Sequence, residues 1–99
     1  MFRGRAAAGI VAAVPSFLVE SYVAGAPLLA QARARARLAA ELADGVSYLR
    51  TTFVPGDETC FHLFEAPSLL SLGDAVGRAA LGHVRIVEAV EMAAARGQR

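Results

Sequence analysis

Hydrophobic and polar residues along this chain follow two periods, one typical of strands and one typical of helices. Residues 16–23, SFLVESYV, alternate with a period of two and are rich in residue types that suit a pleated surface. Residues 28–43 contain no glycine or proline and repeat small apolar side chains at helical spacing, which predicts a helix. Gly25 and Pro27 separate the two segments, and Gly45 is expected to take the left-handed conformation that ends the helix.

Residues 46–66 are predicted to form a hairpin of two strands joined by a tight turn. The first strand, residues 46–54, alternates without interruption. Its predicted faces are Val46, Tyr48, Arg50, Thr52 and Val54 on one side and Ser47, Leu49, Thr51 and Phe53 on the other. In the turn, residues 55–58, Pro55 presets its own backbone angle and Gly56 is expected to take a positive φ.

The second strand of the hairpin, residues 59–66, carries large apolar groups on both of its faces. One face holds Cys60, His62, Phe64 and Ala66, and the other holds Phe61, Leu63 and Glu65. A sheet with one face in water would not need apolar groups on both sides. We therefore expect the chain's own helices to cover one face and a second subunit to cover the other.

The remaining elements complete a known arrangement of helices and strands. Residues 68–81 predict a second helix that begins with Ser68 as its N-cap and is ended by Gly82, and residues 84–92 predict a fourth strand. The order is strand, helix, strand, strand, helix, strand. With right-handed crossovers this order gives an α+β ferredoxin-like sandwich, in which a four-stranded antiparallel sheet carries two helices on one face and dimerises through the other.

Length and composition suit one small domain that associates with itself. The 99 residues are 56% hydrophobic, more than a domain of this size readily buries, which favours a homodimer. The expected domain is residues 16–92, with an extension at 1–15 and a tail at 93–99. Residues 1–14 have two other interpretations, a secretory signal or an upstream misassignment of the start.

The charge and the hydropathy of the chain argue against two classes of partner. A net charge of +1 does not favour nucleic acid or a membrane surface. No apolar run reaches the roughly 18–20 residues that a membrane span needs, so a cytoplasmic protein is predicted. Cys60 is the only cysteine, which excludes an intramolecular disulfide.

Three segments resemble a small bacterial family of uncharacterised ferredoxin-like proteins, of which one branch is described as nickel-binding. The segments are FLVESYV at 17–23, GVSYLRTTFVPGDETCFHLFEAPS at 45–68 and RIVEAVEM at 85–92. The resemblance spans residues 16–92 in the same element order. It implies a dimeric ferredoxin-like fold and, in one branch, binding of nickel. Gly73 and Gly77 depart from the family's second helix, where charged helix formers are expected.

Cys60 and His62 are the candidate metal ligands, with Glu65 as an added carboxylate. Cys60 and His62 lie two residues apart on one strand face, and imidazole and thiolate suit nickel or another divalent transition metal. The site would be completed by Glu20, Glu65, Glu88, His83 or a residue of a second subunit. The alternative is that Cys60 and His62 pack in the core or the dimer interface, with the imidazole hydrogen-bonded.

The sequence thus favours a non-enzymatic, homodimeric binding protein, with two alternatives left open. The first is an enzyme that acts on a small organic molecule in a sheet pocket. Its lining would be Tyr22, Tyr48 and Arg50 with Glu20 and Glu88, and Tyr48, Arg50 or His62 would serve as acid–base groups. The second is a structural or assembly role through the apolar sheet. No hydrolase, zinc-protease or phosphate-loop motif is present, and the RNA-binding strand signature is missing.

Overall fold

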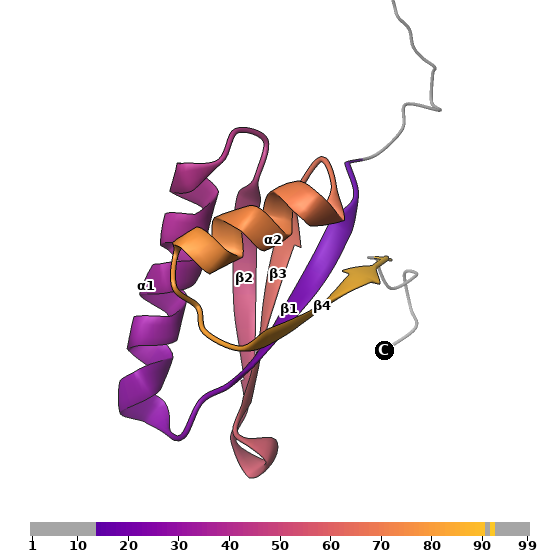
Figure 1. Ribbon diagram of the computed structural model, residues 1–99. Helices are drawn as coiled ribbons and strands as arrows, with labels where there is room; N and C mark the ends of the chain where they lie inside the picture. The colour runs from indigo at the N-terminus through magenta and orange to yellow at the C-terminus, as the bar shows by residue number, and fades with distance from the viewer. Residues whose placement is uncertain (1–13, 91, 93–99) are drawn as a thin grey trace, which may run out of the picture.

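The computed structural model describes residues 14–90 and residue 92 (Figure 1). Its elements are β1 (Ser16–Tyr22), α1 (Ala26–Leu42), β2 (Ser47–Val54), η1 (Pro55–Asp57), β3 (Thr59–Glu65), α2 (Leu69–Arg78) and β4 (Val84–Ala89). Neither described helix has both the length and the hydropathy needed to cross a membrane. Only residues 14 and 15 of the predicted extension are described, and the predicted tail, residues 93–99, lies outside the described residues.

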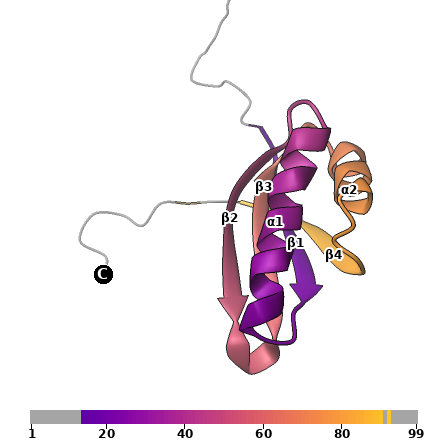
Figure 2. The same ribbon diagram turned by 90° about the vertical axis from the view of Figure 1, so that its left-hand side faces the viewer.

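The four strands form one antiparallel sheet in the order β2-β3-β1-β4. Both helices lie on the same side of this sheet, as Figures 1 and 2 show. The other side, called the open face below, is not covered by any described element of the chain. The predicted α+β ferredoxin-like sandwich is therefore confirmed, whereas dimerisation stays a prediction.

The core lies between the sheet and the two helices. Phe17 and Val19 of β1 and Phe64 of β3 point into it, and Ala36 and Ala39 of α1 are fully buried against them. From α2 come Leu72, Ala75, Val76 and Ala79. The small alanine side chains let α1 lie close to the sheet, and removal of this apolar surface from water drives the packing.

A β-bulge in β2 overturns the prediction that residues 46–54 alternate without interruption. Tyr48 pairs with Phe64 and Arg50 pairs with Leu63, so that Leu49 is an extra residue between the two pairs. Each residue after the bulge therefore faces opposite to the predicted side. Tyr48, predicted to share a face with Arg50, lies instead on the helix-covered side together with Thr51.

The turn of the hairpin also differs from the prediction. Residues Pro55–Asp57 form a turn of 3-10 helix, and Glu58, not Gly56, takes the left-handed conformation with φ 49°. Glu58 is held there because its side chain accepts a hydrogen bond of 2.7 Å from the Tyr22 hydroxyl and its carbonyl accepts one of 2.7 Å from the Val23 N–H. Tertiary contacts thus decide which residue of this turn takes the left-handed conformation.

Gly45, as predicted, takes a positive φ of 81° after α1. A Cβ at this position would lie 2.8 Å from the Pro67 ring, which is a second reason for glycine. The β4 strand was predicted to reach residue 92, but it ends at Ala89, which forms the last pair with β1. Beyond the Ala89–Ser16 pair comes Pro15, which has no N–H to continue the ladder.

The end of α2 comes three residues before the predicted position. The Leu81 N–H donates to the Val76 carbonyl at 3.3 Å and the Ala80 N–H donates to the Gly77 carbonyl at 3.1 Å. This pair of bonds is the Schellman motif, in which the residue at the position of Ala80 is usually glycine. Ala80 has φ 60°, a conformation that costs an L-residue roughly 1–2 kcal/mol.

Replacing Ala80 by glycine should therefore stabilise the protein. We expect Ala80→Gly to raise the free energy of unfolding by about 1 kcal/mol, because glycine has no Cβ penalty at positive φ. The matched control is Gly82→Ala, at φ 84° with no atom within 4 Å of the added Cβ, which should lower it by about 1 kcal/mol. Urea denaturation measures both, and an unchanged or lowered stability of Ala80→Gly would contradict the argument.

Candidate functional site

His62 lies at the centre of the sheet, on the side covered by the helices, and is fully buried. In β3 it pairs with Val19 of β1 on one side and with Thr51 of β2 on the other. Its ring meets the Tyr48 ring edge-on, with 6.4 Å between the ring centroids. Cys60, two residues earlier on the same strand face, is also fully buried.

Four side chains from three strands form a hydrogen-bonded series, called the hydroxyl–imidazole chain below. The Tyr48 hydroxyl lies 2.5 Å from Thr51 Oγ1, and Thr51 Oγ1 lies 2.7 Å from His62 Nδ1. On the other side of the ring, His62 Nε2 lies 3.4 Å from Ser21 Oγ. Because each hydroxyl can donate or accept, a neutral imidazole of either tautomer satisfies both of its nitrogen atoms here.

Burial weakens the basicity of the ring. Desolvation lowers the pKa of His62 from 6.5 to about 4, because the charged imidazolium would have to leave water. Burial also raises the pKa of the Cys60 thiol, which favours its protonated form. His62 is therefore neutral near pH 7, and Cys60 is a thiol.

The fold brings Ser21 next to His62, a contact that the sequence analysis missed. Strand alternation puts Ser21 on the same face of β1 as Val19 and Val23, so its burial can be anticipated from the sequence, but its partner on β3 depends on the strand register. The contact with Thr51 depends on the bulge at Leu49. Ser21 is only 7% exposed, and His62, with a pKa of about 4, is a weak base near pH 7. We therefore interpret the hydroxyl–imidazole chain as structural.

The three predicted metal ligands do not come together. Cys60 and His62 lie beneath the helices, whereas Glu65 belongs to the alternate set of β3 residues on the open face. No group of three or more His, Cys, Asp or Glu side chains that could hold a metal ion occurs within residues 14–90 and 92. In this protomer the residues therefore do not fit a nickel site, and nickel binding stays a prediction.

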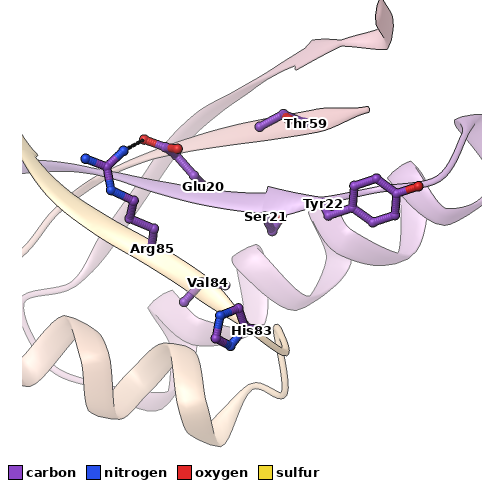
Figure 3. Close-up of a pocket in the computed structure, with 7 residues that line it drawn as sticks. All are labelled: Glu20, Ser21, Tyr22, Thr59, His83, Val84 and Arg85. Atoms are coloured by element: carbon purple, nitrogen blue, oxygen red, sulfur yellow. Dashed lines mark hydrogen bonds and ion pairs between the residues drawn. The ribbon is translucent and has the colours of Figure 1, made fainter. Parts of the chain in front are cut away.

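A hollow of about 260 Å³ lies where β1 and β4 meet near the start of β4 (Figure 3). Its lining is Glu20, Ser21, Tyr22, Thr59, His83, Val84 and Arg85. Arg85 forms an ion pair of 3.2 Å with Glu20 across the two strands. The hydrogen bond to the Glu58 carboxylate, and the negative charge of that carboxylate, raise the pKa of Tyr22. Six of its seven lining residues carry a polar side chain, and Val84 is the apolar one.

This hollow contains only part of the pocket that the sequence predicted. Tyr22 and Glu20 line it, and so does His83, which the sequence named only as an additional metal ligand. Tyr48 does not, because its pairing with Phe64 puts it on the helix-covered side, and neither does Arg50. Glu65 and Glu88 line a different hollow of about 380 Å³, with Ser16 and apolar residues at the far ends of β1 and β4.

Comparisons with protein-family models, with curated proteins and with solved structures gave no match for this chain. The resemblance to the uncharacterised ferredoxin-like family stays a prediction. The fold that the resemblance implied is present, but the fold is established from the strand order and the helix positions.

Stability should fall in mild acid because of His62. The unfolded chain binds a proton at about pH 6.5 and the folded chain only at about pH 4, so stability is lost as the pH falls through this window. The loss amounts to about 3 kcal/mol and levels off below the folded pKa. His62→Gln keeps a neutral hydrogen-bonding group and should lack this component. Urea denaturation at several pH values compares the two, and parallel curves would contradict the assignment.

The same residue gives a direct test of the predicted metal site. Because both ring nitrogen atoms of His62 contact hydroxyl groups and the ring is buried, we expect His62→Ala to leave the affinity for nickel and zinc unchanged. Isothermal titration of the wild type and the variant measures this. Loss of a stoichiometric binding step in His62→Ala alone would show that His62 is a ligand after all.

Proposed function

We propose that this protein is a homodimeric, non-enzymatic binding protein in which two copies pack through their open faces. The observation that carries the proposal is the composition of the open face, which has an apolar centre within a charged rim. This is the usual composition of a specific protein interface. Neither helix covers this face, so the chain has no other element among its described residues to shield the centre.

The apolar centre consists of four side chains on three adjacent strands. Leu18 of β1 pairs with Leu63 of β3 and with Val87 of β4. Phe61 is the next β3 residue on the same face as Leu63 and lies two residues away from it. Leu63 is 2% exposed, whereas the other three are only half-buried. Covering these three with a second copy would remove further apolar surface from water at about 25 cal/mol per Å².

The charged rim holds groups of both signs. Arg50 and Glu65 lie toward one end of the apolar centre, and Glu20 and Arg85 lie on its other side. A twofold axis brings the same surface of both copies together, so a face of one sign would repel itself. A rim with both signs instead allows an arginine of one copy to meet a glutamate of the other. This argues for a second copy as the occupant.

The binding role follows from the hollow in Figure 3. Glu20, Tyr22, Thr59 and Arg85 belong to the open-face set of their strands, so the hollow borders the surface that the second copy would cover. A small polar molecule held there would be partly enclosed by the dimer. His62 and Cys60, the core residues with shifted pKa values, do not line the hollow. Because shifted pKa values are typical of catalytic groups, their absence from the lining favours binding over catalysis.

A charge placed in the apolar centre should separate the dimer. We expect Leu18→Glu to raise the dissociation constant at least 100-fold, because two carboxylates would be buried near the twofold axis. The matched control is Leu70→Glu, at an 85% exposed position on α2, which should leave association unchanged. Sedimentation velocity over a range of concentrations measures both, with circular dichroism to verify folding. A wild-type protein that stays monomeric at high concentration would refute the proposal.

A further inference from the structure

A third hollow, of about 130 Å³, lies on the helix-covered side of the sheet, between the end of β1 and the first turns of α1. Its lining includes Ser21 and Val23 from the end of β1, Leu28, Ala32 and Arg35 from α1, and Leu81 from the segment after α2. The three α1 residues are spaced by four and by three, so they lie on one side of the helix. The hollow is therefore a gap between one side of α1 and the sheet.

The Ser21 hydroxyl at this hollow is buried, but its capacity for hydrogen bonds is only partly used. Ser21 is 7% exposed, and within residues 14–90 and 92 the one hydrogen-bond partner of its Oγ is His62 Nε2, at 3.4 Å. This distance exceeds the roughly 2.7–3.2 Å that is usual between nitrogen and oxygen. A hydroxyl can donate once and accept twice, so Ser21 can bind a further partner with either tautomer of His62.

Arg35 gives this hollow a positive charge. Its Nη1 donates a hydrogen bond of 3.1 Å to the Ala80 carbonyl, which holds the side chain across the gap between α1 and the end of α2. A guanidinium has five N–H donors, so others are left for a second acceptor. No acidic residue lines this hollow, whereas glutamates line both of the hollows described above. The charge of the lining therefore favours an anion.

We infer that this hollow binds a small carboxylate, held by Arg35 and Ser21, with a short apolar chain against Leu28 and Leu81. The planar guanidinium matches the geometry of a carboxylate group. The volume is well below the roughly 300–1,000 Å³ of pockets for drug-sized ligands, so the chain of the ligand must be short. The site lies on the helix-covered side, so it goes beyond the proposed function and does not depend on the proposed dimer.

A bound carboxylate would fix the direction of the hydroxyl–imidazole chain. An ionised carboxylate only accepts hydrogen bonds, so Ser21 donates its proton to the ligand and accepts from the Nε2–H of His62. His62 Nδ1 then accepts from the Thr51 hydroxyl, and Thr51 in turn accepts from the Tyr48 hydroxyl. Binding at the hollow thus sets the tautomer of the buried imidazole.

The site is tested with butyrate as the probe and its neutral amide, butyramide, as the control ligand. Isothermal titration should show one butyrate bound per chain and at least tenfold weaker binding of butyramide. Arg35→Gln should weaken butyrate binding at least tenfold. The matched control is Arg33→Gln, on α1 but outside the lining, which should bind like the wild type. A wild type that does not bind butyrate, or an affinity unchanged in Arg35→Gln, would overturn the inference.

The tautomer of His62 gives a second measurement, which needs no variant. Two-bond ¹H–¹⁵N correlation spectra of the wild type saturated with butyrate should place the imidazole proton on Nε2. A proton on Nδ1 in this complex would overturn the role of Ser21. Sedimentation velocity separates this site from the proposed dimer. A monomer that binds butyrate would refute the dimer and support the site, and a dimer that does not bind it would do the reverse.

Discussion

One bulged residue in β2 determines what each side of the sheet presents. Because Leu49 is an extra residue opposite the Phe64–Leu63 step, Thr51 is turned toward His62 and Arg50 is turned to the open face. If Tyr48 kept its pairing with Phe64 and the bulge were absent, Arg50 would lie opposite His62, and the imidazole nitrogen atom that contacts Thr51 would lose this partner at a cost of about 1–3 kcal/mol. The core and the proposed interface therefore depend on the same local irregularity.

The buried imidazole shows how a polar group is accommodated in so small a core. His62 lies between hydroxyl groups of β1 and β2, so the hydroxyl–imidazole chain joins the three strands β2, β3 and β1 by side-chain contacts in addition to the backbone ladders. Every member of the chain is uncharged near pH 7, which avoids the larger cost of burying an unpaired charge. The same feature makes the fold sensitive to acid and makes the ring a poor base.

The two faces of the sheet divide the properties of the molecule. The helix-covered side provides stability through close packing of small side chains from α1 against Phe17, Val19 and Phe64. The open face contributes little to the protomer's own core, apart from Leu63, and bears most of the charges that β1, β2 and β4 carry. In the proposed dimer the helix-covered side stabilises the protomer and the open face forms the interface. The hollow beside Glu20 and Arg85 lies at the edge of that interface.

The sequence by itself determined the order and type of all six main elements, because the two periodicities, the Ser68 cap and the glycine after α1 are local signals. It also determined that Cys60 and His62 share a face of β3. Only the tertiary structure decided the bulge at Leu49, the left-handed Glu58 and the end of β4, because each depends on a neighbouring strand far away in the sequence. The separation of Glu65 from Cys60 and His62, by contrast, follows from the local alternation of β3, which places the carboxylate on the opposite side of the sheet.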